Sequence, residues 1–242
     1  MAPSTVKLAS GHEMPLVGFG LWKVPTDKAA ETAIRSGYRL FDGAYDYQNE
    51  KEAGQGIQRA IKEGPVKQHA LAFAQSQNEA WGLGYIDLYL IYFPVALSSL
   101  RNDAILYAWW MDDQGTVKPA NILIRETWEA LEEVVDRGIA KSIGVSNFQA
   151  QSLYDVQRYS RHPISSLQIE HHPYLVQPDL IAMAQENNIA VAAYTSFGPQ
   201  SFKELPGIFS KRAHGAKPLL ESSLIEGIAG KYGKTPAQVL LR

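Results

Sequence analysis

Short apolar runs alternate with longer amphipathic patterns along most of the 242 residues. The short runs have the length of β-strands, and the longer patterns repeat their apolar residues at helical spacing. This alternation predicts parallel strands joined by helical crossovers, as in a barrel or a doubly wound sheet. The predicted strands are Leu16–Leu21, Tyr38–Phe41, Leu71–Ala74, Ile86–Tyr92, Lys141–Val145, Leu167–Glu170 and Ala190–Tyr194. The predicted helices are Asp27–Ser36, Glu50–Glu63, Arg125–Arg137, Ala150–Tyr159, Pro178–Asn187 and Leu220–Tyr232.

The glycine pattern favours the barrel over the open sheet. No G-x-G-x-x-G turn follows a predicted strand, and Gly54-Gln55-Gly56 lies inside a helical pattern. We therefore expect a single α/β domain over residues 1–242, a (β/α)₈-type TIM barrel with an N-terminal β-hairpin. Seven strands are visible before Arg242, so we expect an incomplete barrel. Its two open strand edges would favour pairing, and we expect a homodimer.

Composition excludes several classes of protein. The chain has no cysteine and a net charge of −2, from 23 basic and 25 acidic residues, without a basic stripe. We therefore expect no disulfide and no nucleic-acid partner. No apolar run is long enough to span a bilayer, and Met1–Gly11 has no apolar signal segment. These features predict a cytoplasmic protein without a membrane partner. His171 and His172 have no third ligand at suitable spacing, so we expect no metal site.

Polar residues follow several of the predicted strands. In a parallel barrel the active site lies at the C-terminal ends of the strands. Asp42 and Tyr92 follow two strands, and Tyr47 comes five residues after Asp42. The other polar residues at predicted strand ends include Ser76, Ser146 with Asn147, Gln168 with Glu170, and Tyr194. We expect these side chains to converge on one mouth.

Several longer motifs have a specific resemblance. They are Gly18-Phe19-Gly20-Leu21-Trp22, Phe41-Asp42-Gly43-Ala44 with Tyr47-Gln48-Asn49-Glu50, Gly144-Val145-Ser146-Asn147-Phe148, Gln168-Ile169-Glu170-His171-His172-Pro173-Tyr174 and Tyr194-Thr195-Ser196-Phe197-Gly198-Pro199-Gln200-Ser201. In order and spacing they resemble the aldo-keto reductases over nearly the whole chain, and most closely the fungal xylose reductase branch. The resemblance implies a barrel that transfers hydride from NADPH to an aldehyde or ketone.

The resemblance also implies a catalytic tetrad of Asp, Tyr, Lys and His, of which only half is present. Asp42 and Tyr47 match the Asp and Tyr positions. Tyr92 stands where the family has His, and Ser76 falls where it has Lys, with no lysine between Lys67 and Lys118. A tyrosine without a neighbouring cation has a pKa of about 10 and is a poor acid at neutral pH.

The cofactor residues implied by the resemblance are likewise partly present. Ser146, Asn147 and Gln168 match residues that hold the nicotinamide amide, and Tyr194 matches the residue that stacks on its ring. Ser196, Gln200 and Ser201 match the pyrophosphate loop. The family's segment for the adenosine 2′-phosphate follows the eighth strand, which is not seen before Arg242. We therefore expect no NADPH binding or only weak binding.

These substitutions lead us to expect a rewired barrel, or pseudo-reductase, with Asp42, Tyr47 and Tyr92 as catalytic residues. Its non-redox chemistry would be proton transfer, dehydration or cyclisation of a small hydrophobic substrate. Trp22, Phe93 and Trp110 would line the substrate pocket, Trp110 from a long irregular segment over Val95–Asn121. Two alternatives stay open: an NADPH-dependent carbonyl reductase with unusual proton donors, and a non-catalytic binding protein.

Overall fold

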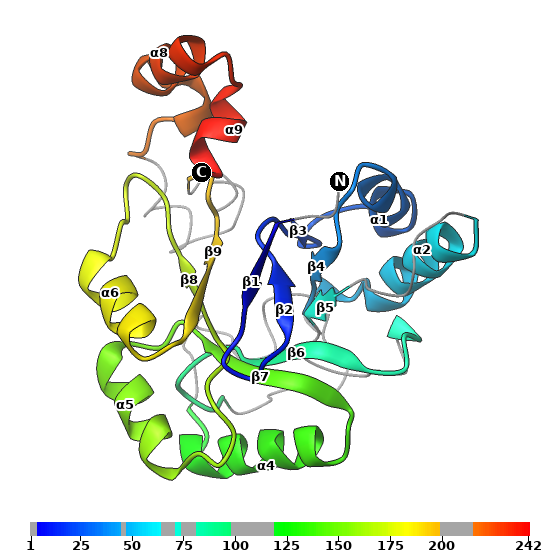
Figure 1. Cartoon of the computed structure of the whole chain (residues 1–242), viewed down its shortest axis with the longest axis vertical. Coiled ribbons are helices and arrows are strands. Elements are labelled where there is room, and N and C mark those ends of the chain that lie inside the picture. The colour runs from blue at the N-terminus through cyan, green and yellow to red at the C-terminus, as the bar shows by residue number, and fades with distance from the viewer. Residues whose placement is uncertain (1–3, 45–46, 64–70, 74–80, 98–118, 199–214) are drawn as a thin grey trace.

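After an N-terminal hairpin, the strands of the chain form a parallel sheet in chain order (Figure 1). The computed structural model describes residues 4–44, 47–63, 71–73, 81–97, 119–198 and 215–242. Over these residues the sheet has seven strands, and every neighbouring pair is parallel. The strands are β3 (Phe19–Gly20), β4 (Leu40–Asp42), β5 (Leu71–Phe73), β6 (Ile86–Ile91), β7 (Ala140–Ser146), β8 (Ser166–Glu170) and β9 (Ala190–Tyr194). This order is the one that the barrel prediction requires.

Helices lie on the outside of these strands (Figure 1). They are α1 (Thr26–Arg35), α2 (Glu50–Glu63), α4 (Ile124–Asp136), α5 (Ala150–Tyr159) and α6 (Pro178–Glu186). A 3₁₀ turn η3 (Leu219–Glu221) and the helices α8 (Ser223–Tyr232) and α9 (Pro236–Leu240) follow. No helix in the described part of the chain is long and apolar enough to cross a membrane.

Side-chain alternation gives each strand one face toward the helices and one toward the barrel interior. Phe41 packs in a core with α1 and α2, whereas Ile143 and Leu167 pack in a second core with α4, α5 and α6. Leu40 and Leu88 belong to a third core on the interior side. The alternating residues at the C-terminal ends of the same strands therefore face the barrel mouth.

The N-terminal hairpin covers the opposite end of the barrel. Its strands β1 (Thr5–Lys7) and β2 (Glu13–Pro15) pair antiparallel, as the sequence predicted. Leu8 and Met14 are buried against the interior core. The Ser10 hydroxyl lies 2.7 Å from the Ser142 hydroxyl of β7. The hairpin thus leaves the C-terminal strand ends as the candidate site.

Several predicted elements are shifted by one or two residues, and two differ more strongly from those observed. The predicted strand Leu16–Leu21 is reduced to β3, since the Leu16 amide bonds to the Ser4 carbonyl and prolongs the hairpin instead. The predicted helix Leu220–Tyr232 is divided into η3 and α8. Ser222 has ψ 122° at this point, an extended backbone that a continuous helix cannot contain.

The long irregular segment begins and ends at one place. Leu97 and Pro119 form an antiparallel bridge, and the Ala120 amide donates to the Ala96 carbonyl at 2.8 Å. Residues 98–118 lie outside the described residues. The predicted substrate residue Trp110 is among them, so its proposed role stays a prediction.

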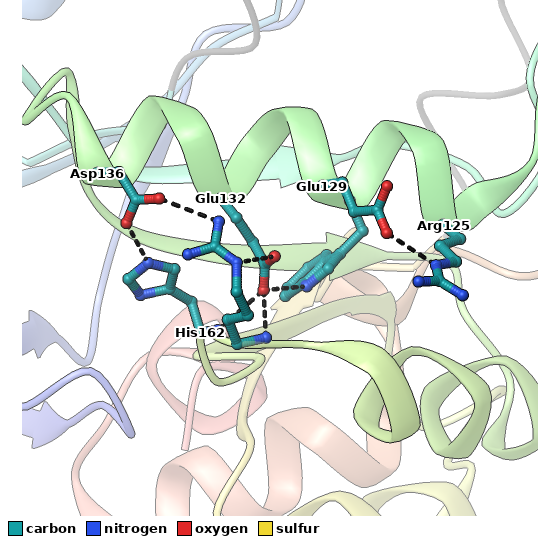
Figure 2. Close-up of polar contacts among 7 residues, drawn as sticks. Arg125, Glu129, Glu132, Asp136 and His162 are labelled. Atoms are coloured by element: carbon teal, nitrogen blue, oxygen red, sulfur yellow. Dashed lines mark hydrogen bonds and ion pairs between the residues drawn. The ribbon is translucent and has the colours of Figure 1, made fainter.

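A polar cluster fastens α4 to the turn that follows α5 (Figure 2). Glu132 is buried and accepts hydrogen bonds from the Trp128 indole at 3.1 Å and from the backbone amides of Arg161 and His162. The Arg161 guanidinium pairs with Glu132 at 3.2 Å and with Asp136 at 3.0 Å. A buried carboxylate is retained here because several donors surround it.

Candidate active site

Side chains from four strands meet at the barrel mouth. Asp42 ends β4, Ser146 ends β7, and Tyr194 ends β9. Gln168 of β8 is the register partner of Ser146, and Glu170 is the register partner of Tyr194. Along each strand these residues alternate with residues that face the helices, so the five side chains face inward. The predicted convergence at the strand ends is therefore found.

Asp42 is bound from across the barrel. Gln168 Nε2 donates a hydrogen bond of 3.1 Å to Asp42 Oδ1, although β4 and β8 are not neighbours in the sheet. Burial raises the pKa of Asp42, and the Gln168 hydrogen bond lowers it by a smaller amount. Asp42 therefore holds its proton at higher pH than an exposed aspartate.

Asn147 connects β7, β8 and β9 and the residue after β6. Its backbone amide donates to the Gln168 carbonyl at 2.9 Å. Its side-chain amide donates to the Tyr92 carbonyl at 2.9 Å and to the Ser146 hydroxyl at 3.1 Å. Its Oδ1 accepts a 2.7 Å hydrogen bond from the Tyr194 hydroxyl. Asn147 has φ +62°, a left-handed conformation that asparagine adopts more readily than most residues.

Tyr194 stays a neutral hydrogen-bond donor at this mouth. Burial is the main cause that raises its pKa, and Glu170 and Tyr92 raise it further. Glu170 in turn lies 2.9 Å from His172 Nε2, and the Tyr174 backbone amide donates to His172 Nδ1. Since Nδ1 accepts a hydrogen bond, the proton lies on Nε2 and points at Glu170. His172 is thus held by Glu170 and by the Tyr174 backbone directly after β8.

The remaining aromatic candidates lie at the rim or behind it. The Tyr92 and Phe93 rings meet edge to face, with centroids 4.8 Å apart, and Phe93 is exposed. The Tyr47 amide donates to the Ala44 carbonyl, and Tyr47 packs against the core of α1 and α2. The Lys23 ammonium lies over the Trp22 ring, 4.8 Å from its centroid.

Some predicted positions cannot be compared with the structure. Gln200, Ser201 and Ser76 lie outside the described residues, while Ser196 is described and partly buried. Thr195 and Gly198 form a turn in which the Gly198 amide donates to the Thr195 carbonyl at 2.8 Å. Within the described ranges, no group of three or more His, Cys, Asp or Glu side chains is placed to hold a metal ion.

The sequence analysis missed a buried carboxylate behind the mouth. Glu50, the first residue of α2, is buried and accepts a hydrogen bond from the Trp81 indole. Its spacing could have shown this. Glu50, Ala53, Ile57 and Ala60 share one helical face, and the last three form the apolar core.

Comparisons with known proteins agree with this architecture. The sequence model of the aldo/keto reductase family matches residues 17–242. A protein of Emericella nidulans named "Probable NAD(P)H-dependent D-xylose reductase xyl1" is 51% identical over 262 residues, which cover 100% of this chain and 81% of that protein. "NAD(P)H-dependent D-xylose reductase XYR1" of Pyricularia oryzae is 49% identical over 265 residues, with the same coverage. The solved structure of the aldose reductase from Schistosoma japonicum matches with a TM-score of 0.82 at 29% identity, over 98% of this chain and 78% of that one. The predicted (β/α)₈ barrel is thereby confirmed.

The same comparisons correct two expectations. The prediction that NADPH binds weakly or not at all is wrong, because relatives aligned over the whole chain are named NAD(P)H-dependent reductases. The interpretation as a barrel rewired for non-redox chemistry, cyclisation included, finds no support. The matches favour the alternative of a carbonyl reductase. The error lay in weighing two substituted tetrad positions above the retained residues at the ends of β7, β8 and β9.

Proposed function

Since the chain belongs to the aldo/keto reductase family, we propose that it is an NAD(P)H-dependent reductase of aldehydes, with an aldose as its substrate class. Relatives that align with the whole chain are named D-xylose reductases. The observation that carries the proposal is the cluster of Ser146, Asn147, Gln168 and Tyr194 at one barrel mouth, joined to Asp42.

The side chains of the mouth fit a nicotinamide carboxamide. A carboxamide needs one hydrogen-bond acceptor for its N–H groups and one donor for its carbonyl. Ser146, Asn147 and Gln168 offer a hydroxyl and two side-chain amides at the adjoining ends of β7 and β8. Tyr194 is held beside them by its bond to Asn147, so its ring forms a fixed wall. These four residues would hold the nicotinamide end of the cofactor.

The protein's part in the reaction is to supply a proton and to orient the carbonyl. When bound, the reduced nicotinamide supplies a hydride to the carbonyl carbon, and the carbonyl oxygen then needs a proton. Asp42, whose pKa burial raises, and the hydroxyls of Tyr47 and Tyr92 are the candidate donors. An acid works best when its pKa lies near the working pH, which favours Asp42 over a phenol, whose ordinary pKa is about 10.

Polar and apolar substrates would make different contacts at this mouth. An aldose needs hydrogen bonds to its hydroxyls, whereas an aromatic aldehyde would rely on Trp22 and the exposed ring of Phe93. The names of the relatives lead us to place the aldose first. A small hydrophobic aldehyde is the second probe.

The test is consumption of NADPH or NADH by the purified protein, followed by absorbance with D-xylose and with benzaldehyde. We expect turnover with D-xylose that falls roughly 10²–10⁴-fold in Tyr47→Phe or Asp42→Asn if each donates or relays the proton. Tyr154→Phe, on the exposed face of α5, should match the wild type. A folded protein that binds neither cofactor and consumes none with either aldehyde would instead be a non-catalytic binding protein.

A further inference from the structure

The hydrogen bond between Gln168 and Asp42 crosses the barrel mouth. In the seven-strand order, three strands separate β4 from β8, yet Nε2 and Oδ1 are 3.1 Å apart. Among the described residues, the Asp42 carboxyl forms no ion pair, and Gln168 is its hydrogen-bond donor. Gln168 is therefore the group that stabilises the charged form of Asp42, against the larger effect of burial.

In the proposed function Gln168 would also contact the nicotinamide carboxamide. Its register partner is Ser146, and its carbonyl is bound to the Asn147 amide, so its side chain starts at the seam between β7 and β8. A carboxamide held by Ser146 and Asn147 would lie along that seam, where it would compete with Asp42 for the Gln168 amide.

We propose that binding of the nicotinamide cofactor draws the Gln168 amide away from Asp42, and that the Asp42 carboxyl then takes up a proton. This inference rests on the proposed function. It makes Gln168 a positioning residue. When its amide moves away, Asp42 becomes protonated and can act as an acid. The step would balance: the reduced nicotinamide would supply the hydride to the carbonyl carbon and be oxidised, while Asp42 would give its proton to the carbonyl oxygen and become a carboxylate.

The direction of the linkage follows from the groups involved. Burial already raises the pKa of Asp42, and the Gln168 hydrogen bond is the opposing influence. Removing a donor from a carboxylate disfavours the charged form, so the pKa rises further in the complex. Asp42 thus has one pKa in the free protein and a higher one in the complex. Between these two values the complex binds more protons than the free protein. Above both, the affinity for the cofactor no longer depends on pH.

Among the described residues, Asp42 is the titratable group whose side chain is hydrogen-bonded to the Gln168 side chain, so this is the bond that cofactor binding could remove. β3 and β5, which flank β4, contain no titratable residue within their bounds. The charged and titratable groups of the other described elements around the mouth or behind it are Lys23, Tyr47, Glu50, Tyr92, Glu170, His172 and Tyr194. Glu50 accepts its hydrogen bond from the Trp81 indole rather than from Gln168. Glu170 is bound to His172, Lys23 lies over Trp22, and the raised pKa of Tyr194 keeps it neutral. Asp42 is the group from which Gln168 would be withdrawn.

Calorimetric titration can count the protons. NADH is titrated into the protein at several pH values in two buffers that differ in ionisation enthalpy. NADH is the probe because the 2′-phosphate of NADPH itself titrates at about pH 6. We expect an uptake of up to about one proton per site, with a maximum between the two pKa values of Asp42. NAD⁺, with its positive ring, should give a smaller uptake.

Matched variants locate the proton. Asp42→Asn keeps the size and an acceptor for Gln168, and should abolish the uptake. Gln168→Leu should reduce it, since Asp42 has then lost its donor before the cofactor arrives. Glu129→Gln, an exposed carboxylate on α4, should leave it unchanged. Circular dichroism and thermal melting check that each variant is folded.

The outcomes are distinct. NADH binding without proton uptake at any pH, or with equal uptake in wild type and Asp42→Asn, overturns the linkage and leaves the proposed reductase intact. If neither NADH nor NADPH binds the folded wild type, the proposed function falls and the linkage with it. Should Asp42→Asn fail to fold, an uptake in Gln168→Leu as large as in wild type contradicts the proposal by itself.

Discussion

The indole Nε1 of Trp81 donates a hydrogen bond of 3.1 Å to Oε1 of Glu50, and both side chains are buried. Trp81 is also pressed against the backbone of two other segments. A Cβ placed on Gly43 would lie 2.6 Å from its ring, and one on Gly54 would lie 2.4 Å from its carbonyl oxygen. The pair thus fixes both ends of the segment between β4 and α2, from which Tyr47 extends.

Glu50 should make stability depend on pH. Burial, the larger influence, raises its pKa from 4.5 to about 7, against the Trp81 hydrogen bond. The folded protein therefore binds more protons than the unfolded chain between these values, and the free energy of unfolding falls as pH rises through about 7. We expect a loss on the order of 2 kcal/mol between about pH 5 and about pH 8.

Urea unfolding of Glu50→Gln at both pH values checks this. The variant should lose less stability with rising pH than the wild type, because its amide does not titrate. Glu52→Gln, at an exposed position in the same first turn, should keep the wild-type dependence. Parallel curves for wild type and Glu50→Gln would show that Glu50 is not the responsible group.

Gly43→Ala should disturb the packing of Trp81, the partner of Glu50, without changing a charge. The new methyl group would meet the Trp81 ring at 2.6 Å, so the ring or the strand end must shift. Such overpacking costs about 1–3 kcal/mol. Because Asp42 is the preceding residue, turnover should fall as well. Gly227→Ala in α8 has nothing within 4 Å and should stabilise by about 0.5–1 kcal/mol, and thermal melting compares the two.

The sequence predicted the strand order and the mouth because both follow from local patterns. Helices α2 and α5 begin and end where their periodicity predicted. Asp42, Ser146 and Tyr194 converge since parallel strands point their C-terminal ends the same way. The Gln168–Asp42 bond did not follow from the sequence, because it depends on how far one side chain reaches across the interior. The Glu132 cluster did not follow for a similar reason, since the backbone amides of Arg161 and His162 are distant from Glu132 in the chain. The burial of Glu50 could have been predicted from its place on the apolar face of α2, but its donor Trp81 could not.

Removing Glu132 should be costly (Figure 2). Glu132→Ala leaves the Trp128 indole and two backbone amides without their acceptor in a buried place. Breaking a buried charged network costs roughly 3–5 kcal/mol. Glu129→Ala breaks only an exposed ion pair with Arg125, which water screens, and should leave the urea midpoint nearly unchanged. Equal urea midpoints for the two variants would contradict the importance of the Glu132 cluster.

Tyr92→His should raise the catalytic rate. Tyr92 stands where the family has histidine, and its backbone is held in place by the Asn147 side chain. A neutral imidazole can donate an N–H to the substrate carbonyl, and its pKa of about 6.5 lets it share protons near neutrality, unlike a phenol at about 10. We expect kcat/KM for D-xylose to rise roughly tenfold or more, since a well-placed acid contributes about 10²–10⁴-fold.

Tyr92→Phe is the matched control, because it keeps the ring that contacts Phe93 and removes only the hydroxyl. Steady-state rates of the three proteins decide the matter. If Tyr92→Phe equals the wild type and Tyr92→His gains nothing, the side chain at this position neither orients the carbonyl nor moves its proton.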